Sequence, residues 1–261
     1  MCAFSSAAAR VQGHRCVCLS IGLSMIWIAL RFPQLTLETV SRSHAPHERR
    51  SLPWAIVEDR RVLACDAQAE TLGLHAGMGL AAAWALAPRL QVRERDSDAE
   101  CAALEGIAAW LCRFTPAVSL ERPHGVLAEV HGSLRHFGGL QALVLQIREG
   151  IAALGFSARL AVAPSAQGAW LLTFGATTPL FEDFSVLRDA LAHLPVEAVC
   201  TTDEGRALLN RIGITTVRQL LRLPRAGVTR RFGPALLERL DRALGMQPDP
   251  RCFFAPPERF A

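Results

Sequence analysis

The sequence predicts an α+β fold, in which a sheet with helices on one face is followed by a small all-α module. Short apolar runs of strand length lie at residues 26–30, 126–131 and 157–163. Between the last two runs, apolar residues recur at helical spacing, namely Leu140, Leu143, Val144, Ile147, Ile151 and Leu154. Strands that alternate with helices before about residue 192, and helices alone after it, are typical of this fold class.

The first part of the chain contains one strand and an inserted segment. The run 26–30 is closed by a proline and suits a buried strand, and the polar stretch 41–53 predicts a loop. Residues 55–65 predict a hairpin. Residues 66–87 are rich in alanine and broken by glycines, which predicts two short helices around a turn.

The middle of the chain supplies the rest of the sheet. We expect a helix over 98–111, a strand over 126–131, a loop over 132–139, a helix over 140–154 and a strand over 157–163. The order strand, inserted segment, helix, strand, helix, strand builds a sheet with helices packed on it.

The last part of the chain predicts the helical module. Helices are expected at 204–211 and 217–223, and a third begins after Gly233-Pro234. Ile212-Gly213-Ile214 forms a tight turn between the first two, and Thr215 or Thr216 can cap the second.

The composition is that of a folded, mildly basic protein. The chain has 261 residues, of which 51% are hydrophobic, too many for a disordered chain. The net charge is +4, and arginine supplies all of the positive charge because the sequence has no lysine. This charge is compatible with a nucleic-acid partner but does not require one. The eight cysteines form no Cys-x-x-Cys pair with matching histidines, so we expect reduced thiols in a cytoplasmic protein, with no disulfide framework and no zinc site.

Residues 1–24 are interpreted as an upstream extension, with the natural start at Met25. The apolar run that ends at Leu30 begins at Cys16 and is shorter than the roughly 20 residues that span a membrane. It is not followed by an Ala-x-Ala cleavage site. We therefore expect neither a membrane segment nor a signal peptide.

Four blocks of sequence, in order, resemble the signature blocks of the Y-family (UmuC-like) DNA polymerases. They are "MIWIALRFPQLTLE" at 25–38, "VEDRRVLACDAQAETLGLHAGMGLAAAWALAPRL" at 57–90, "RFTPAVSLERPHGVLAEVHGSLRHFGG" at 113–139 and "LLNRIGITTVRQLLRLP" at 208–224. The Phe-Pro-Gln and Phe-Gly-Gly segments are most similar to a catalytically degenerate branch of that family, a component of the bacterial mutasome.

The resemblance implies a division of the chain into polymerase-like parts. A ferredoxin-like palm would comprise 25–33 and 95–190, and a small fingers insertion would comprise 34–94. An all-α helix-hairpin-helix thumb would occupy 191–248. Residues 249–261 would then be a linker, or the stub of a missing little finger.

The resemblance also implies where two catalytic magnesium ions would be held. Working members of the family place carboxylates at the positions that align with Leu30 and Phe32, and with His124 and Gly125. Nucleotidyl transfer needs these oxygen ligands to hold two ions about 4 Å apart. Leucine, phenylalanine and glycine offer no ligand and histidine is a poor one for magnesium, so we expect no metal site.

The positions that grip the triphosphate in the family are altered as well. They align with Ala67, Glu70 and Ala166, and the Glu70 carboxylate would repel a phosphate. Other acidic and histidine side chains could in principle rebuild a metal site, but their spacing favours solvated or structural roles; they are Glu38, Glu121, Glu129, His124, His131 and His136. We expect no cofactor.

The helical hairpin is the strongest functional candidate that remains. A helix-hairpin-helix turn presents backbone N–H groups to a DNA phosphate, with glycine allowing close approach. Arginines around such a turn contact phosphates without reading the sequence. The expected DNA-binding residues are Ile212, Gly213, Ile214, Thr215, Thr216, Arg218 and Arg222. The alternative is a solvated helical surface with no DNA contact.

The resemblance implies a non-catalytic scaffold in damage-induced translesion synthesis. It would bind damaged DNA weakly and without sequence preference. It would also bridge an error-prone DnaE-type polymerase, a RecA-like accessory protein and the β sliding clamp. Two alternatives stay open: an active error-prone polymerase with displaced carboxylates, and a truncated fragment without function.

Overall fold

A computed structural model of the protein describes residues 16–17, 25–41, 52–177 and 179–256. The prediction that residues 1–24 form an unpacked extension lies almost wholly outside these ranges. Within it, only Cys16–Val17 are described, as a two-residue strand β1 that pairs with β9 (Arg251–Cys252). Most of the predicted loop at 41–53 also lies outside the described residues.

The centre of the molecule is a four-stranded antiparallel sheet with the order β6-β7-β2-β8. Its strands are β2 (Trp27–Arg31), β6 (Val118–Glu121), β7 (Gly125–Glu129) and β8 (Arg159–Ala163). The helices α5 (Ser97–Leu111) and α6 (Leu140–Ala153) connect them in the order β-α-β-β-α-β. This is the ferredoxin-like arrangement, and the predicted α+β class is confirmed.

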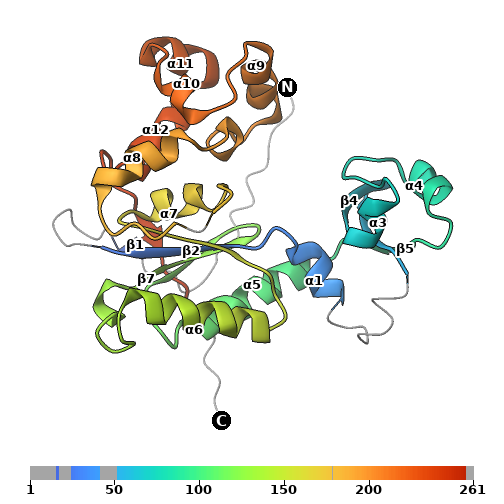
Figure 1. The fold of residues 1–261 in the computed structure, drawn as a ribbon, viewed down its shortest axis with the longest axis horizontal. Coiled ribbons are helices and arrows are strands. Elements are labelled where there is room, and N and C mark those ends of the chain that lie inside the picture. The colour runs from blue at the N-terminus through green and yellow to red at the C-terminus, as the bar shows by residue number, and fades with distance from the viewer. Residues whose placement is uncertain (1–15, 18–24, 42–51, 178, 257–261) are drawn as a thin grey trace, which may run out of the picture.

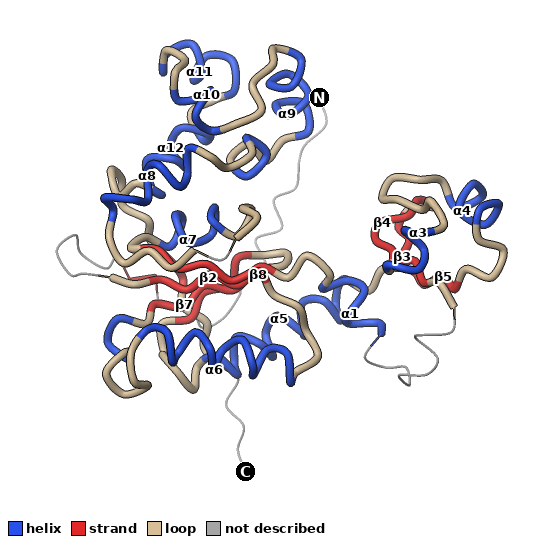
Figure 2. Tube along the Cα trace, viewed as in Figure 1, coloured by secondary structure: helices blue, strands red, loops and turns tan. Residues whose placement is uncertain are grey.

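Helices cover both faces of this sheet, so the prediction of helices on one face was wrong. Figures 1 and 2 show α5 and α6 on one side and α7 (Ala166–Leu172) on the other. The strands are therefore buried on both faces: Ile28 packs toward α5 and α6, while Trp27 and Ala29 pack toward α7. The sequence did not reveal α7 because all seven of its residues are buried, which leaves no amphipathic period to detect.

A small lobe is inserted between β2 and α5. It holds a three-stranded sheet with the order β4-β3-β5, in which the predicted hairpin is confirmed as β3 (Trp54–Glu58) and β4 (Arg61–Cys65). The two short helices are confirmed as α3 (Ala67–Thr71) and α4 (Leu80–Leu86). The parallel strand β5 (Gln91–Glu94) was not predicted.

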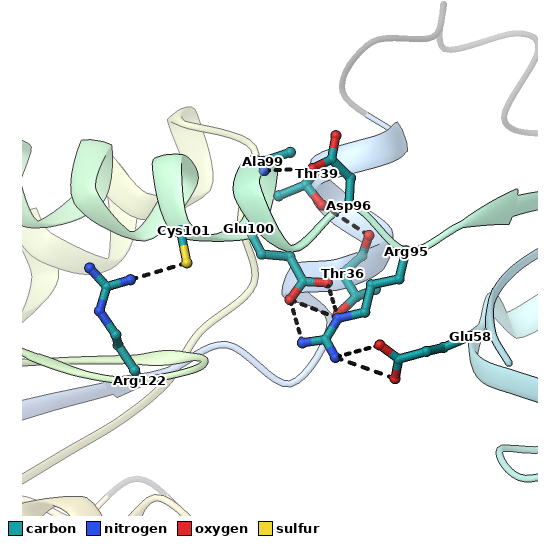
Figure 3. Close-up of polar contacts among 9 residues, drawn as sticks. All are labelled: Thr36, Thr39, Glu58, Arg95, Asp96, Ala99, Glu100, Cys101 and Arg122. Carbon is teal, nitrogen blue, oxygen red and sulfur yellow. Dashed lines mark hydrogen bonds and ion pairs between the residues drawn. The ribbon is translucent and has the colours of Figure 1, made fainter. Parts of the chain in front are cut away.

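The lobe joins the central sheet through helix α1 (Leu35–Ser41) and through one arginine. Arg95 donates hydrogen bonds to Glu58 of the lobe at 3.1 Å and to Glu100 of α5 at 2.9 Å (Figure 3). The Glu100 side chain is only 6% exposed, and its hydrogen bond is the main cause of the raised pKa of Arg95. This guanidinium fixes the point where the lobe meets the sheet.

The helical module lies on the α7 side of the sheet (Figure 1). It comprises α8 (Phe184–Ala192), α9 (Asp203–Arg211), α10 (Val217–Leu221), α11 (Arg225–Phe232) and α12 (Ala235–Ala243). The prediction missed α8 and α11. The module shares one continuous core with α7 and with the face of the sheet that α7 covers. None of the helices in the described part of the chain is long and apolar enough to cross a membrane.

Candidate functional site

The backbones of the four positions that the resemblance aligns with metal ligands lie at one corner of the central sheet, but their side-chain positions are on opposite faces of it. Arg31 pairs with Gly125 across β2 and β7, and Leu30 pairs with Val126. The backbone N–H of Phe32 donates to the carbonyl oxygen of His124 at 2.9 Å. The ends of two neighbouring strands therefore place Leu30, Phe32, His124 and Gly125 within one small region.

Leu30 and Phe32 point away from the face that α7 covers. Both side chains are buried in the core beneath α5 and α6, and the Phe32 ring contacts Phe156 edge-on at 6.1 Å between centroids. Side chains alternate along a strand, so Arg31 between them projects to the opposite face, toward α7. Sequence reasoning passed over Arg31, although strand alternation alone could have identified it.

Arg31 is held firmly in place by the end of α7. Its guanidinium donates to the Thr173 hydroxyl at 3.3 Å and to the Thr173 carbonyl at 3.1 Å, and lies 4.3 Å from the centre of the Phe174 ring. Burial, and next the charge of Arg159, lower its pKa. An arginine thus lies beside the positions aligned with metal ligands, where its charge would oppose a magnesium ion.

Trp170 of α7 packs directly on the backbone of Gly125. A Cβ atom at Gly125 would lie 2.2 Å from the Trp170 atom Cζ3 and 3.0 Å from the Glu121 carbonyl oxygen. Such distances are far below van der Waals contact, so a glutamate at this position has no room for its first carbon. We refer to Arg31, His124, Gly125, Trp170 and Thr173 as the sheet corner.

His124 completes the sheet corner with a mostly neutral ring. Its centroid lies 6.1 Å from that of Trp170. Burial is the main cause of its lowered pKa, and the charge of Arg31 lowers it further. The corner therefore combines a fixed cation with neighbouring aromatic rings that meet at an angle.

The three carboxylates that could have rebuilt a metal site are engaged elsewhere. Glu38 accepts from the backbone N–H of Ser157 at 2.9 Å, Glu129 accepts from that of His131 at 3.0 Å, and Glu121 pairs with Arg251. Within the described ranges, no three His, Cys, Asp or Glu side chains gather as a metal-binding group.

The positions aligned with triphosphate contacts do not meet at the sheet corner. Ala67 and Glu70 are exposed on α3 of the small lobe, which Figure 1 shows well apart from the central sheet. Ala166 is 2% exposed at the start of α7, inside the shared core. Alanine at that depth makes a packing contact and offers no group to a phosphate.

The hairpin in the helical module has the predicted geometry, but its N–H groups are already used. Gly213 has a φ of +76° and ends α9, and its N–H donates to Asn210 at 3.0 Å. The Ile214 N–H donates to Leu209 at 2.9 Å, and the Ile212 N–H donates to Leu208 at 3.2 Å. The expectation that this turn presents free N–H groups to a phosphate was therefore wrong.

The following residues are engaged in the same way, which leaves the arginines as the candidate contacts. Thr216 caps α10, and the Gln219 amide oxygen accepts from the N–H groups of Thr215 at 2.8 Å and Thr216 at 3.1 Å. Arg218 and Arg222 are both exposed and lie one helical turn apart. The Arg218 guanidinium lies 2.8 Å from Nε2 of His193.

The fold is similar to those of solved DNA polymerase structures. The chain is similar to an insertion ternary complex of Dbh DNA polymerase, with a TM-score of 0.69 and 18% identity over 87% of this chain and 69% of that one. It is also similar to DinB from Sulfolobus solfataricus, with a TM-score of 0.67 and 17% identity over the same shares. The predicted polymerase-like α+β fold is thereby confirmed.

Sequence comparison then gives the family. Residues 37–173 match the family model described as IMS, the impB/mucB/samB family. The chain is 38% identical over 189 residues to Protein ImuB of Caulobacter vibrioides, from both strain NA1000 / CB15N and strain ATCC 19089 / CIP 103742 / CB 15. These residues are 71% of this chain and 40% of the Caulobacter protein, so the chain spans less than half the length of these relatives. The chain belongs to the impB/mucB/samB family, and the UmuC-like resemblance is confirmed.

Proposed function

We propose that this chain is a non-catalytic Y-family homologue that serves as a DNA-binding scaffold in damage tolerance and induced mutagenesis. Its family membership supports a role in damage tolerance. The observation that carries the non-catalytic part is the Trp170 ring packed on Gly125, where a second carboxylate would have to stand. If a ligand had been lost by substitution alone, a neighbouring acidic side chain could replace it. No acidic side chain can enter a space that the Trp170 ring already fills.

The charge at the sheet corner supports the same proposal. A fixed guanidinium at Arg31 provides positive charge where catalysis would require carboxylates to gather two divalent ions. Arg31 forms its hydrogen bonds to Thr173 within the protein, so it stabilises the fold without a ligand. The remaining task of such a chain is to bind and to position other molecules.

In this proposal the central sheet with α5, α6 and α7 acts as the palm, and the small lobe acts as the fingers. The helices up to α12 form the thumb, and residues 249–261 act as a linker. DNA would be held weakly through Arg218 and Arg222, without base contacts. The error-prone DnaE-type polymerase, the RecA-like accessory protein and the β sliding clamp are the protein partners that the resemblance implies.

Primer extension on a damaged and an undamaged template, with magnesium and then with manganese, tests the proposal. We expect no nucleotide incorporation with either metal, while an active family polymerase extends the primer under the same conditions. Calorimetric titration with a nucleoside triphosphate should give no magnesium-dependent binding in the micromolar range. Extension that depends on metal would overturn the proposal in favour of an active polymerase.

A further inference from the structure

A polar pocket of about 330 Å³ lies where the helical module, α7 and the segment after α12 meet. We call it the junction pocket and define it by Glu121, Gln167, Thr202, Arg239, Arg242 and Arg251. Glu121 connects it to the sheet corner, because the Glu121 carbonyl lies beside Gly125 while its side chain lines the pocket. The pocket is lined neither by the four positions aligned with metal ligands, nor by the three aligned with triphosphate contacts, nor by the expected DNA-binding residues at 212–222.

Each of the three acidic side chains that line the junction pocket forms an ion pair with an arginine, and Arg251 serves two of them. Arg251 forms ion pairs with Glu121 and, at 2.9 Å, with Asp249, and its side chain is only 12% exposed. Glu238 pairs with Arg242 at 3.6 Å. These contacts leave one cation of the pocket without a carboxylate partner.

That cation is Arg239 on α12. In the part of the chain that the structure describes, its guanidinium forms no hydrogen bond or ion pair, and the side chain is half-buried. Burial, opposed by the attraction of Glu121, lowers the pKa of Arg239, and the charges of Arg251 and Arg242 lower it further. A half-buried guanidinium without an acceptor is unfavourable unless a ligand supplies one.

Gln167 provides an independent sign of a missing ligand. It is 6% exposed, and its amide oxygen accepts from Arg251 at 3.2 Å. Its amide nitrogen Nε2 is buried with no hydrogen-bond partner among the described residues, and so is Nε of Arg251. Buried donors are normally satisfied, so the polar side chains around the junction pocket are not fully paired among the described residues.

We infer that the junction pocket binds a phosphate group, carried either by a nucleotide or by the DNA backbone. Arg239 lines this open polar pocket together with Arg242 and Arg251, and arginine suits phosphate oxygens in particular. The pocket exceeds the volume of one phosphate, which leaves room for an attached sugar. This inference does not rest on the proposed function, since it requires neither a metal nor its absence.

The experiment measures binding by calorimetry with EDTA present, so that metal-dependent nucleotide binding plays no part. The probes are inorganic phosphate, deoxyadenosine monophosphate and a short single-stranded oligonucleotide. The test variants are Arg239→Gln, which removes the unpaired charge, and Gln167→Glu, which places a negative charge in the pocket while its carboxylate can still accept from Arg251. Arg148→Gln on α6 is the matched control, because this exposed arginine lies on the other side of the sheet.

We expect phosphate or the mononucleotide to bind the parent and the control equally, and both test variants about tenfold more weakly. A parallel loss of oligonucleotide binding assigns the phosphate to DNA, and a loss confined to the mononucleotide assigns it to a free nucleotide. If the parent binds none of the three probes, or if both test variants bind as the parent does while remaining folded by circular dichroism, the inference is overturned.

Discussion

The sheet corner and the junction pocket are neighbours, and they use arginine differently. At the sheet corner, Arg31 is bound by Thr173 and a phenylalanine ring, and Trp170 fills the space above Gly125. At the junction pocket, Arg239 has no hydrogen-bond acceptor among the described residues, and an open pocket lies beside it. The difference is that the arginine of the sheet corner is held by its own protein, whereas that of the pocket is accessible to a ligand.

A substitution of Arg251 tests the junction pocket. We expect it to have the largest effect on the free energy of unfolding. Arg251→Met removes the ion-pair partner of Glu121 and Asp249 in a largely buried site. The free energy of unfolding in urea should fall by about 3–5 kcal/mol. The exposed pair Arg122–Glu105 is the control, and Arg122→Met should change stability by no more than about 1 kcal/mol. Equal effects of the two variants would mean that burial does not strengthen the Arg251 network.

A substitution of Gly125 tests the packing at the sheet corner. Gly125→Ala forces a methyl group against the Trp170 ring and should lower the free energy of unfolding by about 1–3 kcal/mol. Gly132→Ala, at a site with open space around the added carbon, should have little effect. In a Trp170→Leu background the Gly125→Ala change should become nearly neutral. If it stays unfavourable there, the tryptophan is not what closes the corner.

Arg218 and Arg222 separate DNA binding by the helical module from phosphate binding in the pocket. We expect the parent to bind DNA with a dissociation constant of about 10⁻⁴ to 10⁻⁶ M at physiological salt. The double variant Arg218→Ala, Arg222→Ala should weaken binding similarly for all sequences and reduce the salt slope by up to about 2 units. It should leave phosphate binding unchanged, and Arg148→Ala should leave both unchanged. An unaltered salt slope would remove these two arginines from the DNA-binding surface.

The smallest expected effect is a pH dependence of stability that arises at His124. Its folded pKa lies below the reference value of 6.5, so below pH 6.5 the unfolded chain binds more protons than the folded one. The contribution is complete above pH 6.5 and is lost progressively as the pH falls toward the folded pKa. His124→Gln should flatten this part of the stability curve, whereas His131→Gln, at an exposed site, should not. A parent curve that is flat between pH 6.5 and 5 would contradict the role given to burial.

The sequence by itself determined the fold class, most of the elements and the family. Strand β2 and helix α6 were predicted nearly to the residue, because the strand is a short apolar run bounded by a proline and the helix has an amphipathic period. The absence of carboxylates at Leu30, Phe32, His124 and Gly125, which the family resemblance aligns with metal ligands, can also be read directly from the sequence, because it concerns residue type alone.

Only the tertiary structure shows which side chains occupy the sheet corner. Strand alternation aims Arg31 at α7, and the packing of α7 places Trp170 on Gly125, although these residues lie 45 positions apart in the printed numbering. The engaged N–H groups of the 212–216 turn, the unpaired Arg239 and the buried donor of Gln167 are likewise outcomes of packing. Residue identity states which groups a chain carries, but only the folded chain decides which donors are left without an acceptor and which volumes are already filled.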